Sequence, residues 1–560
     1  MTDDHPVPNG SEQELPGEPY FGSSGQTATG SRRNTGIRHR GIAFIIVVAT
    51  ASGHLAGLQW AGDHLSRRSL GTVIPWTFGC LLMLLWWTFL SGVCWKTRFR
   101  GLGIVAFGAL LFVGVFRWEG QSGNFVPHFG LRFFPTAEEH AVQYFKSESG
   151  ESASFTVSER LEITSDDWPG FGGIRQDQIV RNVTIRRDWD EKPPAVLWRH
   201  PVGPGWSSFA IVGQRAFTQE QRGEDEAVVC YDAATGKQIW LHTDRARFSD
   251  AASGAGPRAT PTIHSSRLYA LGATGILNCL DPVTGDCHWT RNIIEDAGTR
   301  LIEWGMAGSP LIYEDVVIVN PGGKTAAVIA YDCLTGEQRW SGAGDRATYA
   351  SPQIAELDGV PQVLIYCSTG LWAHAADSGK KLWSFPWTNM TRLNIAQPIV
   401  LPDKSVFISS GYGGGSALLS VTRSGDNWQV EPQWTRPDRF QLKFNGGIYR
   451  DGYVYGLDDG ILSCFDLSIG QKTWKRGRYR FGQIVMVGDD LLVLTESGRV
   501  VLVEVTPETM TEVSAFQAIE GKTWNHPVVN RGRLYVRNGQ EAACYDLSLQ
   551  VKPAQETGLH

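Results

Sequence analysis

The sequence predicts an all-β fold, an eight-bladed β-propeller of four-stranded antiparallel blades, preceded by three transmembrane helices. One short pattern of Asp, Gly and Trp recurs along the chain at intervals of about 43 to 51 residues, the range of propeller blades. Alternating apolar and polar residues, typical of half-buried strands, precede the copies, and helical periodicity is nearly absent over residues 200–550. Three long apolar stretches come before the repeats.

The repeated pattern is a small residue, any residue, Asp, three residues, Gly, three residues and Trp. Four copies share this spacing: VVCYDAATGKQIW (228–240), LNCLDPVTGDCHW (277–289), VIAYDCLTGEQRW (328–340) and LSCFDLSIGQKTW (462–474). A fifth copy, LWAHAADSGKKLW (371–383), carries Ala375 in place of Asp.

Each position of the pattern has a local physical role. Asp at a strand end accepts backbone hydrogen bonds, Gly closes the turn with a positive φ, and the Trp ring packs at the seam between neighbouring sheets. We therefore predict that these residues build the blades and contact no ligand. They are Asp232, Gly236, Trp240, Asp281, Gly285, Trp289, Asp332, Gly336, Trp340, Gly379, Trp383, Asp466, Gly470 and Trp474.

The last repeat predicts how the ring closes. Eight inner strands can be counted between residues 207 and 531, but the final repeat, AACYDLSLQVKPAQ (542–555), lacks the Gly and the Trp. A matching outer strand stands ahead of the first repeat, in AVLWRHPV (195–202), where Trp198 takes the docking position. We expect the two ends of the ring to pair there, because a closed ring leaves no unpaired strand edge.

The cysteines indicate packing rather than chemistry. Cys230, Cys279, Cys464 and Cys544 occupy one position of the repeat in four different blades, so they cannot all meet. A buried Cys there replaces the small Ala of other copies. Since no CxxC pair is present, we predict neither a disulfide framework nor a metal site.

Composition divides the chain into four regions. Residues 1–40 are polar and are predicted to be a disordered cytoplasmic tail. Residues 41–118 contain the apolar segments, each close to the roughly 20 residues that a membrane-spanning helix needs. Residues 119–165 are interpreted as a linker, and residues 166–560 as the propeller. The apolar segments are residues 41–60, 70–93 and 101–118.

Basic residues predict the orientation of the apolar segments. One cluster precedes the first segment and another lies between the second and the third, and both favour the cytoplasm. We expect a multi-pass protein of the inner (cytoplasmic) membrane with its propeller in the periplasm or an equivalent extracytoplasmic space. The net charge of −6 gives no sign of a nucleic-acid partner. The clusters are Arg32, Arg33, Arg38 and Arg40, then Lys96, Arg98 and Arg100.

The repeat, met most fully from Cys230 to Trp240, resembles the tryptophan-docking motif of the pyrroloquinoline quinone (PQQ) type β-propeller, over about residues 166–550. The segment DWPGFGGIRQDQ (167–178) looks like the leader of membrane-anchored PQQ-like proteins of planctomycete-type bacteria, with Gly172 where Arg is usual. Quinoprotein dehydrogenases and the lipoprotein propeller of outer-membrane protein assembly share the repeat. The resemblance therefore implies a fold rather than one function.

Three classes of function remain open. A scaffold or binding module for a protein or small-ligand partner is preferred, because it needs no catalytic constellation and none of the common motifs is present. The resemblance also implies a PQQ-dependent dehydrogenase of alcohols or sugars, which would hold PQQ and calcium. The adjacent cysteines of its alcohol-oxidising branch and a heme motif are missing here, so we predict no cofactor, with PQQ and calcium as the alternative, and we favour a non-enzymatic role while leaving the enzyme class open. The third class is a small-ligand sensor.

Any binding site is expected at the funnel mouth, where the inner strands begin and side chains from all blades converge. Aromatic, cationic and amide side chains are mixed there, which suits an anionic or planar ligand. His526 alone is more consistent with a hydrogen-bonded strand residue than with a metal ligand. The candidate residues are Trp206, Arg258, Glu303, Trp304, Tyr349, Arg392, Asn394, Lys443, Asn445, Trp524, Asn525 and His526.

Overall fold

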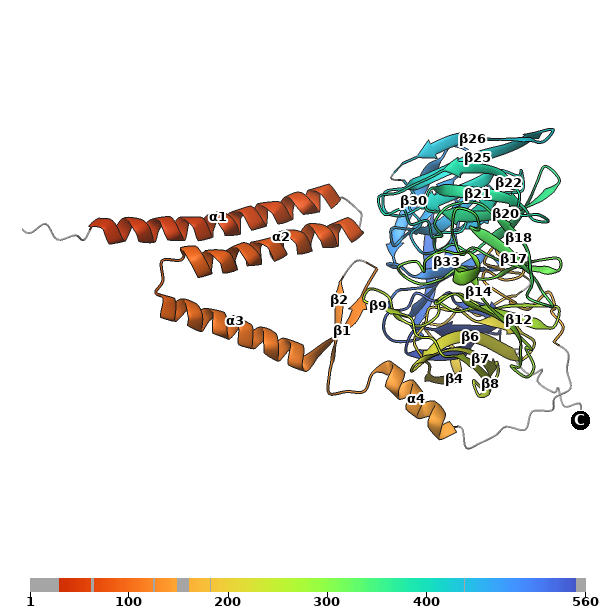
Figure 1. The fold of residues 1–560 in the computed structure, drawn as a ribbon, viewed down its shortest axis with the longest axis horizontal. Helices are drawn as coiled ribbons and strands as arrows, with labels where there is room; N and C mark the ends of the chain where they lie inside the picture. Colours follow the sequence, from red (N-terminus) through yellow and green to blue (C-terminus); the bar gives the residue numbers. More distant parts are fainter. Residues whose placement is uncertain are drawn as a thin grey trace, which may run out of the picture. The chain divides into compact units, whose positions relative to one another are not determined.

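The computed structural model describes residues 30–61, 65–123, 126–148, 161–181, 183–437 and 439–549. The chain divides into two compact units, one made of residues 1–59 and 71–108 and the other of residues 60–70 and 109–560. The first unit is helical, and the second contains the propeller (Figure 1).

Three N-terminal helices are long and apolar enough to cross a membrane, over His39–Trp60, Leu70–Leu90 and Trp95–Val115. α3 begins at Trp95, so Lys96, Arg98 and Arg100 lie in its first turns rather than in a loop before it. The helical elements are α1 (Gly30–Ala61), α2 (Leu65–Leu85), the π-helical turn η1 (Trp86–Leu90) and α3 (Trp95–Val115).

Helices and strands lie in two further segments, one predicted to be a disordered tail and one interpreted as a linker. α1 begins at Gly30, so residues 30–40 of the predicted disordered tail are helical, and residues 1–29 lie outside the described residues. The predicted linker contains most of a hairpin and a helix that packs on the propeller. These are β1 (Phe116–Gln121), β2 (Pro127–Leu131) and α4 (Ala137–Glu148).

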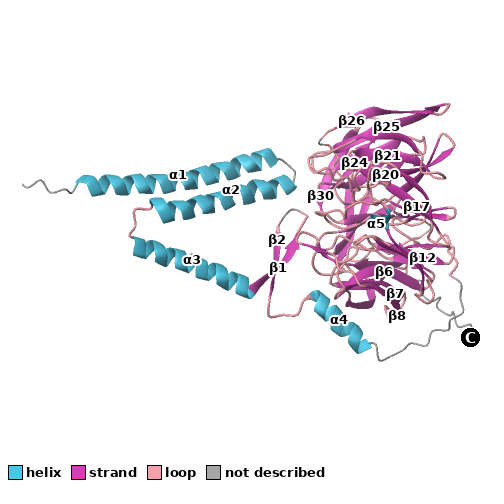
Figure 2. Ribbon diagram, in the orientation of Figure 1, coloured by secondary structure: helices cyan, strands magenta, loops and turns pink. Residues whose placement is uncertain are grey.

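The described residues form eight four-stranded antiparallel blades, as the sequence predicts, and Figure 2 shows strands as their dominant element. The first four blades follow chain order. They are β5 (Ala210–Val212), β6 (Arg215–Arg222), β7 (Asp225–Asp232) and β8 (Gln238–Asp244); β11 (Thr262–His264), β12 (Arg267–Leu271), β13 (Ile276–Leu280) and β14 (Cys287–Asn292); β15 (Leu311–Tyr313), β16 (Val316–Val319), β17 (Val328–Asp332) and β18 (Gln338–Gly342); and β19 (Gln353–Leu357), β20 (Val360–Cys367), β21 (Gly370–Ala375) and β22 (Lys381–Pro386).

The next three blades also follow chain order, and a short strand of the leader joins the seventh blade in parallel. They are β23 (Ile399–Val400), β24 (Val406–Ser410), β25 (Gly415–Ser424) and β26 (Asn427–Arg436); β27 (Ile448–Arg450), β28 (Tyr453–Asp458), β29 (Ile461–Asp466) and β30 (Gln471–Arg478); and β31 (Gln483–Val487), β32 (Asp490–Leu494), β33 (Arg499–Val505) and β34 (Met510–Gln517), with β3 (Ile179–Val180) beside β31. Between blades lie β9 (Ser249–Asp250), β10 (Gly254–Ala255) and α5 (Ile293–Asp296).

The eighth blade confirms the predicted ring closure. Its first three strands come from the end of the chain, and its outer strand comes from the segment ahead of the first blade, with Cys544 opposite Trp198 in antiparallel register. The strands are β35 (Val528–Asn530), β36 (Arg533–Arg537), β37 (Glu541–Asp546) and β4 (Ala195–Pro201).

The repeated residues join each blade to the next. In the first turn, the Asp232 carboxylate accepts the backbone N–H of Ala234 and Thr235 at 3.0 and 2.7 Å. Gly236 follows with φ +71°, and the ring of Trp198 from the eighth blade lies directly against it.

The same arrangement recurs at other seams. Gly285, Gly336, Gly379 and Gly470 lie against Trp240, Trp289, Trp340 and Trp434 of the preceding blades. Most of these indoles donate their N–H to the carbonyl just after the turn Asp, as Trp240 does to Pro282 at 3.1 Å. Trp383 instead donates to Gln362 of its own blade at 2.7 Å, and the fifth blade that follows has a longer turn before Trp434.

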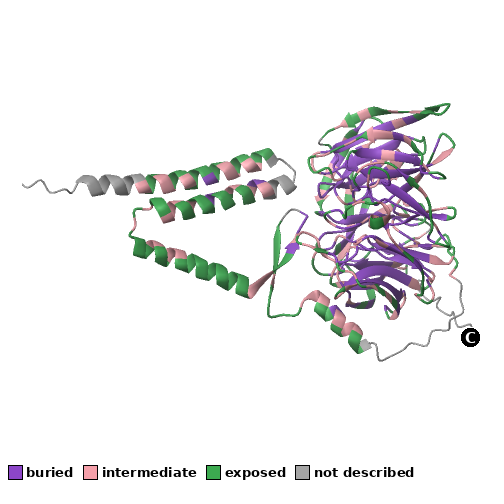
Figure 3. Ribbon diagram, in the orientation of Figure 1, coloured by how far each residue is buried: buried purple, intermediate pink, exposed green. Residues whose placement is uncertain are grey.

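The core of the second unit consists of these blade strands. Figure 3 shows buried residues along the propeller strands, whereas exposed residues dominate the β1–β2 hairpin. Cys230, Cys279, Cys464 and Cys544 are all buried and unpaired, each in its own blade. The blades therefore present a rigid frame around the axis, where the inner strands begin.

Candidate functional site

A cavity of about 220 Å³ lies at the propeller axis. All eight blades contribute to its wall, mainly through the residues that precede their inner strands. Two segments outside the blades line it as well, Gln121–Gly123 at the tip of the β1–β2 hairpin and Phe171 of the leader. The predicted convergence of side chains at the axis thus produces a real cavity.

Small hydroxyl side chains join the first blades around this cavity. The backbone N–H of Ser208 donates to Thr260 Oγ1 at 3.1 Å, and the N–H of Thr260 donates to Ser309 Oγ at 2.9 Å. The N–H of Ser309 donates to Ser351 Oγ at 2.9 Å, and that of Ser351 to Gln397 Oε1 at 2.8 Å. Because these side chains join neighbouring blades by hydrogen bonds, they fix the spacing between the blades around the cavity.

Aromatic rings line several sides of the cavity. Trp304 stacks on Tyr349 with ring centroids 5.3 Å apart, and the backbone N–H of Trp304 donates to the Tyr349 hydroxyl at 3.2 Å. On another side, Trp206 and Trp524 lie 4.9 Å apart, with Phe444 5.0 Å from Trp524. Flat π surfaces on two sides suit a planar ligand.

Lys443 is the most deeply buried cation of the wall. Its side chain is 4% exposed, and Nζ lies 4.7 Å from the Tyr412 ring centre and 4.4 Å from the Phe481 ring centre. Nζ also donates to the carbonyl of Gly123 at 2.9 Å. Burial lowers the pKa of Lys443 to about 8, so the amine is mostly charged at neutral pH and sensitive to any anion beside it.

Glu496 holds the other side of the hairpin tip. Its Oε1 accepts the backbone N–H of Gly123 at 2.6 Å and the indole N–H of Trp524 at 2.9 Å. A Cβ at Gly123 would lie 2.2 Å from the Phe481 ring, so only glycine fits this position. A buried cation and a buried carboxylate thus hold both polar groups of one main-chain residue.

Lys522 adds a second cation at the mouth. Its Nζ lies 5.1 Å from the Trp206 ring centre and 4.5 Å from the Trp524 ring centre. It donates to the carbonyls of Gln121 and Ala252 at 3.2 and 3.4 Å. Burial lowers its pKa to about 8 as well.

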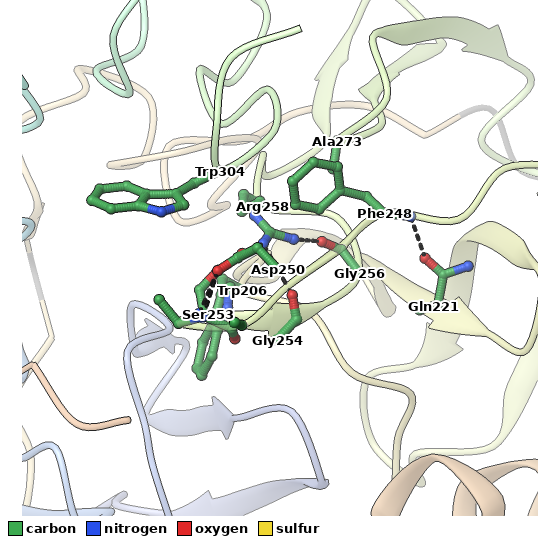
Figure 4. Close-up of polar contacts among 12 residues, drawn as sticks. Trp206, Gln221, Phe248, Asp250, Ser253, Gly254, Gly256, Arg258, Ala273 and Trp304 are labelled. Atoms are coloured by element: carbon green, nitrogen blue, oxygen red, sulfur yellow. Dashed lines mark hydrogen bonds and ion pairs between the residues drawn. The ribbon is translucent and has the colours of Figure 1, made fainter. Parts of the chain in front are cut away.

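Arg258 lines the cavity but is committed to its own loop, as Figure 4 shows. Its Nη2 donates to Asp250 Oδ2 and Ser253 Oγ, each at 2.8 Å, and Nη1 donates to the carbonyl of Gly256. The guanidinium lies 4.4 Å from the Phe248 ring centre, and burial lowers its pKa to about 10. Arg258 therefore stabilises the β9–β10 loop and offers only part of its charge to a ligand.

His526 contacts the leader at the cavity wall. Its ring meets Phe171 edge to face at 4.8 Å, and its backbone carbonyl accepts the Ser208 hydroxyl at 2.6 Å. His526 stands just before β35, and the hydrogen bond given for it is made by its backbone. Burial lowers the pKa of His526 to about 4, so the ring is neutral at physiological pH and a weak base.

The structure separates the remaining predicted residues from the cavity, with the exception of Asn445. Asn394 and Asn525 are buried and brace loops: Asn394 donates to the carbonyls of Cys367 and Trp387, and Asn525 to those of Gly205 and Ser207. Asn445 lines the cavity while its amide donates to the carbonyl of Leu457.

Two of the predicted charged residues point elsewhere. Glu303 and Arg392 are exposed and do not line the cavity. Both stand only a few residues before an inner strand, but Arg392 sits in a turn with φ +55°, away from the wall. Of the twelve predicted residues, eight line the cavity: Trp206, Arg258, Trp304, Tyr349, Lys443, Asn445, Trp524 and His526.

The leader crosses the axis at the other end of the cavity. Trp168 exchanges backbone hydrogen bonds with Ile211 of the first blade, and the Gln178 carbonyl accepts the N–H of Met486 in the seventh. Between them, Phe171 lines the cavity. The predicted leader motif therefore forms part of the cavity wall.

The donor set does not fit calcium-bound PQQ. Among the described lining residues no Asp or Glu side chain is present, and calcium in proteins takes six to eight oxygen ligands that normally include carboxylates. Asp250 and Glu496 are near but are engaged by Arg258 and by Gly123 with Trp524. Among the same described lining residues, no carboxylate is present to act as a general base.

Sequence reasoning missed the hairpin tip, Glu496, Lys522 and Tyr412. The tip was missed because its segment carries no repeat pattern and lies more than 300 residues from its partners. Glu496 lies in the turn between β32 and β33, and a charged side chain in such a turn is ordinarily exposed to water. Lys522 could have been found from the sequence, since it stands two residues before Trp524 in the segment just ahead of the eighth inner strand.

Comparisons with known proteins agree with the architecture. The family model described as outer membrane protein assembly factor BamB matches residues 224–476. No curated protein matches the chain. Among solved structures, BamB from Moraxella catarrhalis is 18% identical over 63% of this chain and 99% of its own, with a TM-score of 0.47.

Two similar structures are enzymes. Quinohemoprotein alcohol dehydrogenase from Comamonas testosteroni is 14% identical over 75% of this chain and 86% of its own, with a TM-score of 0.50. Quinohemoprotein alcohol dehydrogenase ADHIIG from Pseudomonas putida HK5 is 13% identical over 70% and 84%, with a TM-score of 0.52. Identities this low reflect the fold alone. The family model thus matches the repeats of residues 224–476, and the eight four-stranded blades fit the fold of a PQQ-like β-propeller.

Proposed function

We propose that the protein is a membrane-anchored binding module, with its propeller outside the cytoplasm and a small planar anion as the ligand of its central cavity. The observation that carries the proposal is the wall itself. Trp304 stacks on Tyr349 on one side, and the rings of Trp206 and Trp524 lie tilted against each other on another. Lys443 presents a buried amine between further rings. Such a wall supplies flat apolar contact and one charge, which together orient a planar carboxylate.

The cavity chemistry favours binding over catalysis. His526 has a pKa of about 4, which leaves it a weak base at neutral pH, and no carboxylate faces the cavity among the described residues. A dehydrogenase needs a general base near its substrate and an electron acceptor. The wall offers contacts for binding without a partner for proton transfer.

A protein partner is the second candidate, and the hairpin tip favours it. Lys443 and Glu496 already hold the main chain of Gly123 in the mouth. An extended segment of another protein could make the same two hydrogen bonds in its place. Trp304 and Trp524 are partly buried in the cavity, so such a partner would have to insert a segment to reach them.

The direct join between α3 and the β1–β2 hairpin is compatible with a sensing role. β1 begins at Phe116, directly after the end of α3 at Val115, and its tip lines the cavity. A ligand that displaced the tip would move a segment joined without a linker to a helix apolar enough to span a membrane. This gives the sensor alternative a physical route.

A ligand titration tests the proposal. The full chain in nanodiscs is titrated with planar aromatic carboxylates, PQQ included, with and without calcium, and tryptophan fluorescence is followed. We expect saturable quenching that does not need calcium, and no reduction of an electron-accepting dye with alcohols or aldoses. Substrate-dependent dye reduction above a boiled control would instead support the dehydrogenase.

A protease experiment tests the membrane topology. Protease added to intact spheroplasts should remove the propeller, since the basic clusters at residues 32–40 and 96–100 favour the cytoplasm. A propeller that survives until the inner membrane is lysed would contradict the orientation.

A further inference from the structure

The outer side of the β1–β2 hairpin exposes a cluster of large aromatic side chains. We call this cluster the outer aromatic patch, and its members are Trp118, Phe129, Phe133 and Phe134. They are 48%, 45%, 76% and 64% exposed, and Figure 3 shows the hairpin mostly in the colour of exposed residues. Each fully buried ring of this size is worth roughly 2 kcal/mol or more, so leaving four of them in water is unfavourable.

The patch is continuous with the last turn of α3. The ring of Phe112 lies 4.9 Å from Phe116 and 5.1 Å from Phe129, and Phe129 lies 5.5 Å from Trp118. An unbroken row of rings therefore runs from a helix that is apolar enough to span a membrane onto the hairpin.

Two arginines fix the turn that carries Phe133 and Phe134. Arg117 donates from Nη1 to the carbonyl of Phe134 at 2.8 Å and from Nη2 to that of Pro135 at 3.2 Å. Arg132 donates from Nε to the carbonyls of Val113 and Phe116 at 2.7 and 3.0 Å. The second arginine thereby satisfies a free carbonyl at the end of α3, where a cation also complements the helix dipole.

The short distance between the end of α3 and Trp118 indicates that a lipid surface covers the patch. α3 ends at Val115, and a strand rises about 3.3 Å per residue, so Trp118 lies within roughly 10 Å of the end of the helix. The headgroup layer on each side of the hydrocarbon core is about 5–8 Å thick. Aromatic side chains and arginines are the residues that concentrate in this layer.

We propose that the outer aromatic patch seats in the headgroup layer of the bilayer that contains α3. The inference rests on the proposed membrane anchoring and adds the surface by which the propeller meets the lipid. The other end of the same hairpin, Gln121–Gly123, lines the cavity.

Photocrosslinking in nanodiscs tests the proposal. p-Benzoylphenylalanine replaces Phe133 or Phe134 in the full chain, and irradiated protein is analysed by mass for lipid adducts. Phe107, in the middle of α3 and 67% exposed, is the positive control. Leu334, in the turn of the third blade and 68% exposed, is the matched apolar control away from the hairpin.

We expect lipid adducts at positions 107, 133 and 134, and none at 334. Adducts at 107 without adducts at 133 and 134 would overturn the inference while leaving the membrane span intact. Absence of adducts at 107 as well would contradict the span itself, and the inference with it. A crosslinked protein in place of lipid at 133 or 134 would overturn the inference in favour of a protein partner.

A double substitution supplies a second readout. F133S with F134S should leave the melting temperature nearly unchanged, because both rings are exposed in the fold. It should lower lipid crosslinking from a probe at Phe129 several-fold, whereas L334S should not. Equal crosslinking in both variants would mean that Phe133 and Phe134 do not hold the hairpin at the lipid.

Discussion

At the scale of residues, one contact repeats around the ring: a glycine of one turn against a tryptophan of the preceding blade. Gly285 adopts φ +82°, and a Cβ there would lie 2.7 Å from the Trp240 ring. The indole N–H of Trp240 reaches the carbonyl of Pro282 in the same turn. Glycine is therefore required twice, for its backbone conformation and for the space that the ring fills.

G285A should destabilise the propeller by more than the backbone conformation alone explains. An L-residue in the left-handed region costs about 1–2 kcal/mol, and the added methyl group must also displace Trp240. G425A is the matched control, since Gly425 has φ +61° with open space around it. Chemical denaturation should give a clearly lower midpoint for G285A than for G425A. Equal midpoints would mean that the glycine serves the turn and not the docking.

Lys443 in the cavity wall and Lys522 beside Trp524 predict a pH dependence of anion binding. Burial lowers the pKa of Lys443 and of Lys522 to about 8, so both are mostly charged at pH 7 and mostly neutral at pH 9. An anion binds the charged form, so its affinity should fall as pH rises through 8, by up to about tenfold for each lysine that it contacts. Titration of an aromatic carboxylate and of its neutral amide checks this. If the affinity for the neutral amide fell as much with rising pH as the affinity for the carboxylate, the charge of the lysines would be ruled out as the cause.

At the scale of elements, β4 decides whether the ring is closed. It supplies the outer strand of the eighth blade, and its Trp198 docks on the first blade with an indole hydrogen bond to Ala233 at 3.1 Å. The fully buried Arg537 adds a second connection, from the eighth blade to the carbonyls of Gly203 and Gln219.

Deleting residues 193–202 should lower the melting temperature by many degrees, because one strand ladder and one buried Trp are lost together. W198A alone should cost about 3–5 kcal/mol. V196S and L197S in the same strand are the controls, since these side chains are 54% and 40% exposed and should change stability little. An unchanged melting curve for the deletion would contradict closure through β4.

The elements that could be predicted are those marked by a short pattern of neighbouring residues in the sequence. The turn Asp, Gly and Trp recur at fixed spacing, so the blades and even the origin of the eighth outer strand could be inferred from the residues alone. The β1–β2 hairpin and α4 carry no such spacing. Their positions depend on contacts more than 80 residues away in the chain, such as Glu138 with Arg247, which no local pattern encodes.

At the scale of the whole molecule, the closed ring makes a cavity and two segments from outside the blades complete it. The inner-strand positions predicted eight of the cavity residues, because every blade must bring its first residues to the axis. Glu303 and Arg392, also predicted from loops ahead of inner strands, are exposed and do not line the cavity. The charges that hold the hairpin tip, Lys443 and Glu496, acquire their role only when residues 121–123 are in place.

The central claim, that this cavity is a binding site, is tested most directly by removing its buried amine. Calorimetric titration of a planar aromatic carboxylate compares the full-length chain with K443M and with K380M, whose lysine is exposed on a blade turn. We expect K443M to lower the affinity for the anion at least tenfold and K380M to leave it unchanged. The affinity for a neutral planar analogue should be the same in all three proteins. Equal anion affinity in all three proteins would contradict the central claim.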